Sequence, residues 1–127
     1  MPATNFDTER EYDPERFSTR KIFRSERMKI VLGYFEPDQF IPVHAPGSDL
    51  VVSIQRGSGT VRDGETDRRV APGDVVVVPA DADRGIRADD DERLEALLVT
   101  APPPTDAEHQ PVREGLRTND FEPEHDQ

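Results

Sequence analysis

The stretch APGDVVVVPADADRGIRA, residues 71–88, decides the fold class of this chain. It opens with the turn signal APGD, residues 71–74, in which proline presets φ and glycine lets the chain reverse. The run Val75–Val78 follows and is apolar at every position. We expect a β-strand covered on both faces there, because an exposed one would promote aggregation. RGIRA, residues 84–88, is a second β-type run, so the stretch indicates short strands joined by turns.

The sequence on either side of this stretch also consists of short β-type runs separated by turn residues. Asp63-Gly64 offers a tight primed turn, since glycine tolerates positive φ without strain. No stretch of comparable length keeps a helical period. The spacing of runs and turns is typical of an antiparallel barrel or sandwich. The further β-type runs are MKIVLGYFE (28–36), DLVVSIQ (49–55), SGTVRD (58–63), TDRRV (66–70) and RLEALLV (93–99).

The chain has 127 residues, enough for one hydrophobic core, and its apolar residues cluster between residues 28 and 99. We therefore expect an N-terminal arm over residues 1–24, a barrel over 25–100 and a polar tail over 101–127. The arm either docks on the sheet through its aromatic residues or is a disordered leader. The tail begins with three stiffening prolines and is too polar for a core of its own. The expected docking residues of the arm and tail are Tyr12, Phe17, Val112, Leu116 and Phe121.

The charge balance is strongly acidic. Twenty-seven acids oppose sixteen bases, which gives a formal charge of -11, and only Lys21 and Lys29 are lysines. This composition is typical either of adaptation to high salt, where screening removes the repulsion between carboxylates, or of an ordinary acidic protein. Nucleic acid is excluded as a partner in both cases, because no basic stripe is available to bind phosphates.

The chain contains no cysteine, which excludes disulfides, thiolate metal ligands and a cysteine nucleophile. No apolar run is long enough to span a membrane, so no membrane partner is expected. The N-terminal residues have neither an apolar segment nor a twin-arginine signal. We therefore expect a cytoplasmic protein.

Residues 73–88 resemble the second conserved motif of the cupin family, G-x5-P-x-G-x2-H-x3-N. Gly73 and Pro79 match this motif in place. Asp81, Arg84 and Ala88 stand where the motif has its second glycine, its histidine and its asparagine. The histidine position, usually a metal ligand in the family, therefore holds an arginine here.

The first cupin motif, G-x5-H-x-H-x3-4-E-x6-G, can be aligned backwards from its closing glycine, Gly57. With three residues in the variable gap, His44 takes the position of the first histidine. The second histidine, the glutamate and the opening glycine are replaced by Pro46, Leu50 and Asp38. Three of the four usual metal ligands are thus absent.

The resemblance covers residues 28–100 and implies an all-β, cupin-type antiparallel β-barrel, also described as a double-stranded β-helix or jelly roll. The family includes isomerases, dioxygenases, decarboxylases, sugar-binding regulators and storage proteins, so the fold does not fix the chemistry. It also implies a homodimer, in which the apolar strand Met28–Phe35, taken as an edge, and the N-terminal arm form the contact.

The motif register places alternate residues inside the barrel, in an apolar pocket with one imidazole and one guanidinium. We expect no cofactor and no tightly bound divalent metal, since the charge of Arg84 would repel an ion beside His44. The alternative is a metal site in which His109 folds back to join His44, with Asp49 or Glu108 adding oxygen. His125 is expected at the surface. The expected inward residues are His44, Pro46, Leu50, Val52, Ile54, Arg84, Ile86 and Ala88.

The candidate ligand-binding residues are His44, Arg84, Asp49, Gln55 and Gln39. A bulge would turn the Asp49 carboxylate inward to form a structural salt bridge with Arg84. Without that bridge, Arg84 is free to bind a carboxylate or phosphate with two parallel hydrogen bonds. His44 supplies a hydrogen bond or a titratable base, although no residue that would orient it is evident.

Three functions are compatible with this pocket. We favour a small-molecule-binding protein, a sensor or accessory protein that holds an anionic or carboxylate ligand without metal. The alternative is an enzyme, an isomerase, lyase or dioxygenase, that uses His44 as its catalytic base or the His44/His109 metal site. The third is a partner protein whose barrel serves only as a scaffold for dimerisation.

Overall fold

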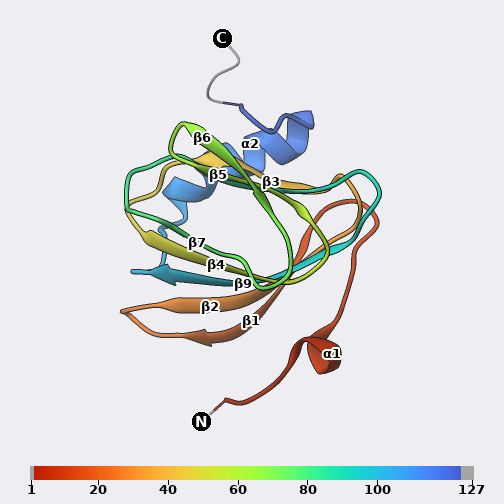
Figure 1. Ribbon diagram of the computed structural model, residues 1–127. Coiled ribbons are helices and arrows are strands. Elements are labelled where there is room, and N and C mark those ends of the chain that lie inside the picture. Colours follow the sequence, from red (N-terminus) through yellow and green to blue (C-terminus); the bar gives the residue numbers. More distant parts are fainter. Residues whose placement is uncertain (1, 124–127) are drawn as a thin grey trace.

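The computed structural model describes residues 2–123 and consists of two antiparallel β-sheets packed face to face (Figure 1). The larger, five-stranded sheet has the order β1-β2-β9-β4-β7, and the four-stranded sheet has the order β3-β8-β5-β6. This arrangement confirms the all-β, antiparallel prediction. The strands of the larger sheet are β1 (Ser18–Arg24), β2 (Lys29–Phe35), β9 (Leu94–Ala101), β4 (Asp49–Arg56) and β7 (Val75–Val78). Those of the smaller sheet are β3 (Phe40–His44), β8 (Arg84–Ala88), β5 (Gly59–Asp63) and β6 (Thr66–Val70).

The hydrophobic core lies between the two sheets and follows the alternation of strand residues. In β4, Leu50, Val52 and Ile54 are buried, while the residues between them are partly exposed. Ile86 and Ala88 of β8 are buried in the same core. The motif register therefore predicted the inward face of both strands correctly.

The two predicted turns are present. In the turn at residues 71–74, the Asp74 amide donates a hydrogen bond to the Ala71 carbonyl at 3.0 Å, and Gly73 has φ +95°. The β5–β6 hairpin reverses at Gly64, where φ is +65°. Both glycines occupy the left-handed region, which side chains with a Cβ adopt only with strain.

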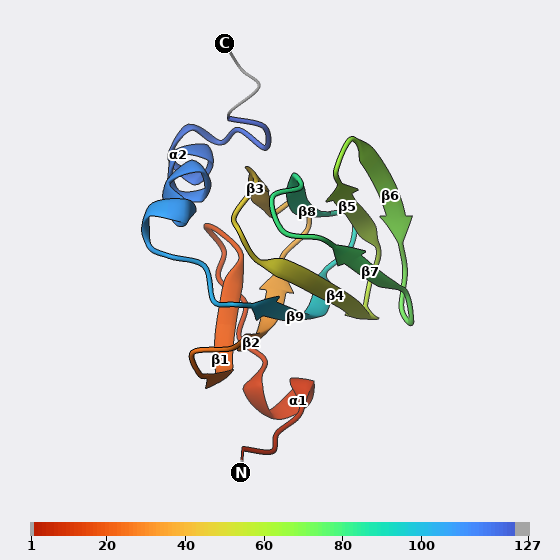
Figure 2. The same ribbon diagram turned by 90° about the vertical axis from the view of Figure 1, so that its left-hand side faces the viewer.

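The prediction that Val75–Val78 is covered on both faces is wrong. Val76 and Val78 are buried, but Val75 and Val77 are 60% and 57% exposed. The reason is that β7, which pairs with β4 at the edge of the larger sheet (Figure 2), has Val76 and Val78 on its inner face and Val75 and Val77 on the outer face, which is left uncovered. Only one of its faces turns toward the opposite sheet.

Strand β1 was not among the predicted strands. It pairs with β2 along its whole length, so the sheet begins at Ser18, inside the stretch predicted to be an arm. Strand β2 lies between β1 and β9 and is no edge. Because Met28–Phe35 is not an exposed edge, it no longer gives a reason to expect a homodimer. The homodimer stays a prediction.

The arm before β1 packs on the outer side of the larger sheet. It contains the short helix α1 (Phe6–Glu9). The Tyr12 hydroxyl donates to Glu95 at 2.5 Å, and the Arg10 Nε donates to the same carboxylate at 2.6 Å. Glu95 is fully buried under these partners. The rings of Phe17 and Phe35 stack 5.7 Å apart, so the arm docks through its two expected aromatic residues.

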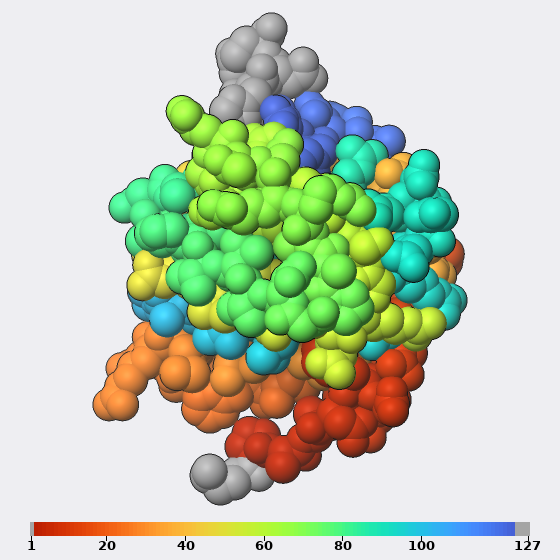
Figure 3. Space-filling model, viewed as in Figure 1, coloured from red at the N-terminus to blue at the C-terminus, as the bar shows by residue number. Residues whose placement is uncertain are grey.

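The tail after β9 folds back over the smaller sheet as a 3-10 turn, η1 (Ala107–His109), and helix α2 (Gln110–Thr118). The ring of Phe121 meets Phe40 edge to face at 5.8 Å, and its carbonyl accepts a hydrogen bond from the Val43 amide at 2.7 Å. The tail thus docks as expected, with a helix that the sequence pattern did not predict. In Figure 3 the arm and α2 lie at opposite ends of the molecule.

Among residues 2–123, neither α-helix is long and apolar enough to cross a membrane.

Candidate ligand site

A cavity of about 290 Å³ lies between the two sheets at the end that η1 and α2 cover. Strands of both sheets and the tail contribute to its wall. Most of the wall is apolar, which suits the body of a small organic ligand. The aliphatic side chains that line it are those of Val31, Ile41, Leu50, Ile86, Leu98 and Val112.

The ionisable groups of the cavity are all basic. Within the part of the chain that the structure describes, no Asp or Glu belongs to the cavity lining. This is the reverse of the whole chain, in which acids outnumber bases by twenty-seven to sixteen. The cavity therefore favours an anion. The basic residues that line it are Lys29, His44, Arg84, His109 and Arg113.

Arg84 begins β8 and lies opposite His44 of β3 in the strand register. Its side chain is only 2% exposed. Nη2 donates to the Pro79 carbonyl at 2.9 Å and to the Ala82 carbonyl at 3.3 Å. Nη1 is the one buried side-chain nitrogen or oxygen among residues 2–123 without a hydrogen-bond partner. Burial lowers the pKa of Arg84, but a guanidinium keeps its charge at physiological pH.

His44 is 8% exposed and held in one orientation. Its Nδ1 lies 2.9 Å from the Pro42 carbonyl oxygen, which can only accept, so Nδ1 carries the proton. Burial lowers the pKa of His44 to about 4, and the charges of Arg84 and His109 act in the same direction. The ring is therefore neutral at pH 7, with a lone pair on Nε2. The backbone supplies the orienting partner that the sequence did not reveal.

Lys29 lines the cavity from the beginning of β2, and sequence reasoning missed it. Within residues 2–123, its amino group has no hydrogen bond or ion pair. Burial lowers the pKa of Lys29, and the charges of Arg24 and Lys21 lower it further. The alternation of β2 could have revealed it, because Lys29 shares a face with the core residue Val31.

His109 and Arg113 reach the cavity from the tail. His109 lies at the end of η1, and Arg113 lies one turn further along, in α2. Arg113 already contacts Asp106 at 3.3 Å and is half exposed. The sequence placed His109 near the barrel only as an alternative, and the structure brings it to the cavity.

Asp49 does not turn inward. Leu50 lines the cavity, while Asp49 is exposed and accepts a hydrogen bond from the Ala80 amide at 2.8 Å. No salt bridge joins Asp49 to Arg84 in the described part of the chain. The expected bulge is absent at Asp49, because β4 alternates from its first residue; the register shifts lie between Ile41 and His44 of β3 and between Ile54 and Arg56 of β4.

Gln39 and Gln55 also lie outside the cavity. Gln39 connects the arm to the barrel, since its Nε2 donates to the Asp13 carbonyl at 2.7 Å and its Oε1 accepts from the Glu36 amide at 2.8 Å. Gln55 is exposed near the end of β4. Of the five candidate ligand-binding residues, the structure brings only His44 and Arg84 together.

The residues of the cavity do not fit a metal. His44 and His109 both line it, but residues 2–123 contain no group of three or more His, Asp or Glu side chains placed to hold an ion. Glu108, an expected oxygen ligand, instead accepts hydrogen bonds from the Gly47 and Thr105 amides at 2.7 and 2.8 Å. The Arg84 charge would further oppose a cation. His125 lies outside the described residues.

No protein-family model matches this chain, and no curated protein does. Solved structures do. The crystal structure of TT1209 from Thermus thermophilus is 35% identical, with a TM-score of 0.78, over 82% of this chain and 100% of that one. An RmlC-like cupin protein from Desulfovibrio desulfuricans is 30% identical, with a TM-score of 0.71, over 81% and 98%. A double-stranded β-helix protein from Klebsiella pneumoniae is 16% identical, with a TM-score of 0.72, over 79% and 89%, and shares the fold.

Proposed function

This chain belongs to the RmlC-like cupin family, and we propose from this premise that it binds a small carboxylate-bearing molecule in the barrel without a tightly bound metal. The family's fold hosts many unrelated functions, so the proposal rests on the contents of the cavity.

The observation that supports the proposal is the unpaired Nη1 of Arg84. A buried donor without a partner costs about 1–3 kcal/mol, and a charged one costs more. A ligand carboxylate that accepts from Nη1 would remove this cost. Because the carbonyls of Pro79 and Ala82 already fix the guanidinium, little side-chain entropy is lost when the ligand binds.

The surroundings of Arg84 support the same ligand class. All the ionisable residues lining the cavity are basic, and the apolar wall weakens the competition from water. The neutral His44 ring presents Nε2 as a hydrogen-bond acceptor, suited to a hydroxyl or amide on the ligand.

The enzymatic alternative uses His44 as a general base. Its orientation by Pro42 favours this role, but its pKa of about 4 makes it a weak base at neutral pH, where efficient general bases have a pKa near 7. The version with a His44/His109 metal site lacks a third ligand in the described part of the chain. Binding is therefore the better-supported function.

The test is calorimetric titration of the protein with short-chain carboxylates, comparing the unmodified chain with Arg84→Gln. Hydrogen bonds to charged groups contribute about 1.5–3 kcal/mol, so we expect the substitution to weaken binding about 10- to 100-fold. Arg117→Gln is the matched control, because Arg117 is exposed on α2 and pairs with Glu114. Equal affinities for the unmodified protein and Arg84→Gln would overturn the proposal. Absence of any carboxylate binding would favour the scaffold alternative.

A further inference from the structure

We propose that the cavity has a second anion-binding point, formed by Lys29 and His109, and that the ligand carries two acidic groups joined by a short apolar chain. This inference rests on the proposed function, which concerns Arg84 alone. It adds the ligand's chemical class and a binding role for Lys29.

Lys29 is central to this proposal because, among residues 2–123, no acidic side chain forms an ion pair with its amino group. Lys29 lines the cavity, and the charges that act on its amino group, those of Arg24 and Lys21 of β1, are also positive. His109 of η1 lines the same cavity, and burial, together with the charge of Lys29, lowers its pKa, so its neutral ring offers an N–H donor. A partly buried ammonium group among like charges is unfavourable unless an anion joins it.

The neighbouring acids do not neutralise this point. Asp106 is held by Arg113 at 3.3 Å. Glu108 accepts hydrogen bonds from the Gly47 and Thr105 amides. Although the protein has a net charge of -11, no acidic residue among those described lines the cavity. The anion that pairs with Lys29 must therefore come from a ligand.

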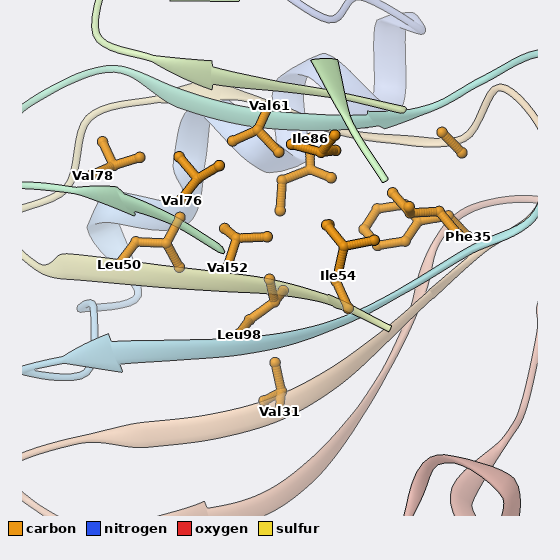
Figure 4. Close-up of a cluster of buried hydrophobic side chains, with 14 residues drawn as sticks. Val31, Phe35, Leu50, Val52, Ile54, Val61, Val76, Val78, Ile86 and Leu98 are labelled. Carbon is orange, nitrogen blue, oxygen red and sulfur yellow. The ribbon is translucent and has the colours of Figure 1, made fainter. Parts of the chain in front are cut away.

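The two anion-binding points lie on opposite walls. Arg84 belongs to β8 of the smaller sheet, and Lys29 belongs to β2 of the larger sheet. Between them the wall is apolar, and Figure 4 shows Ile86 from one sheet facing Leu98 and Val31 from the other. A ligand that reaches both points therefore needs an acidic group at each end and an aliphatic middle.

The volume of the cavity limits the length of this ligand. The cavity volume of about 290 Å³ lies just below the usual range for small-molecule sites, roughly 300–1,000 Å³. A short dicarboxylate, or a carboxylate with a phosphate or phosphonate at the other end, matches this size and this charge pattern. A long-chain fatty acid does not, because it is too large and has one acidic group.

The experiment is calorimetric titration with matched pairs, succinate against butyrate, glutarate against valerate and adipate against hexanoate. We expect at least one dicarboxylate to bind at least tenfold more tightly than its monocarboxylate. Lys29→Gln should abolish this difference while preserving monocarboxylate affinity, and Lys29→Arg should retain much of it. Arg117→Gln, at an exposed arginine of α2 that pairs with Glu114, is the control and should leave the difference unchanged. A titration with 3-phosphonopropionate reports whether the second group is a carboxylate or a phosphonate-type anion.

The outcomes separate the two proposals. If monocarboxylates bind through Arg84 but dicarboxylates gain nothing, the second point is refuted and the first stands. An equal loss of both ligand types in a folded Lys29→Gln variant would also refute it. If no mono- or dicarboxylate binds, both proposals fail together.

Discussion

His44 is a histidine that the folded protein keeps neutral. Its pKa is about 4 in the folded state, against about 6.5 for an exposed histidine, mainly because of burial. The unfolded chain therefore binds more protons between these two values. The stability that neutral His44 permits is fully present above pH 6.5 and is lost as the pH falls toward 4.

We expect this linkage to cost about 2 to 3 kcal/mol of unfolding free energy between pH 7 and pH 4.5. Urea unfolding at the two pH values measures it, and His44→Gln, which cannot titrate, should lose correspondingly less. Asp89, whose pKa is lowered to about 2 by Arg69, affects stability mainly below this window. Equal pH dependence of the two proteins would contradict the prediction.

We predict that Arg84 opposes metal binding at this site. His44 and Arg84 are directly opposite in the register of β3 and β8, so a histidine at position 84 would face His44 across the strand pair. We expect Arg84→His to raise the affinity for Ni²⁺ or Zn²⁺, since it replaces a repelling charge with a ligand. Titration of untagged protein measures this, and His44→Ala in the Arg84→His background should reverse it. Near-stoichiometric metal in the unmodified protein, lost on His44→Ala, would show that the arginine does not exclude an ion.

At the scale of elements, α2 is held against β3 by a close contact at Gly115. A Cβ added there would lie 2.5 Å from Cβ of Pro42 and 2.6 Å from the Asp120 carbonyl oxygen. Helix propensity alone predicts that Gly115→Ala stabilises the protein by about 0.5–1 kcal/mol. Because a backbone carbonyl cannot yield easily, we expect a net loss of about 1–3 kcal/mol instead.

Urea unfolding decides the sign of this change, and the carboxylate titration shows whether the displaced helix also weakens binding. Arg117→Ala, on the exposed side of the same helix, is the control and should change stability by less than about 0.5 kcal/mol. A more stable Gly115→Ala protein would show that the contact relaxes without cost.

The sequence predicted the elements whose pattern is local. Strand alternation gave the inward residues of β4 and β8, and turn chemistry gave the reversals at Gly64 and Gly73. Strand β1 was not predicted because its sequence, STRKIFR, is mostly charged or polar and shows no apolar face. It is an exposed edge strand. Helix α2 was not predicted because it is short and polar, and its stability comes from docking on β3.

In the candidate site, too, only the residues fixed by a local pattern could be predicted from the sequence. His44 and Arg84 follow from motif register, since they lie on neighbouring strands of one sheet. Lys29 and His109 belong to distant parts of the chain, and only the packing of the tail over the barrel brings them to one cavity. Asp49 was misjudged because β4 alternates from its first residue, which turns Leu50 inward and Asp49 outward, and the register shift of β4 lies at its other end, between Ile54 and Arg56.

At the scale of the whole molecule, the acidic surface has a consequence for stability in salt. The net charge of -11 repels itself, and this repulsion destabilises the compact state at low ionic strength. Many surface carboxylates pair with arginines, such as Asp63 with Arg68 at 2.8 Å and Asp38 with Arg87 at 2.9 Å. Exposed pairs of this kind contribute about 0–1 kcal/mol each, so their screening by salt costs little.

We therefore expect the melting temperature to rise with KCl from about 0.05 M into the molar range, because screening relieves the net repulsion and the Debye length falls to about 3 Å at 1 M. A rise of about 5 °C would correspond to roughly 1 kcal/mol for a domain of this size. Calorimetric melts at several salt concentrations measure it. Asp90→Asn combined with Asp91→Asn, at two exposed acids in one loop, should melt higher at low salt and respond less to KCl. A flat or falling melting temperature would mean that the attractive pairs outweigh the repulsion, and that the composition is not an adaptation to salt.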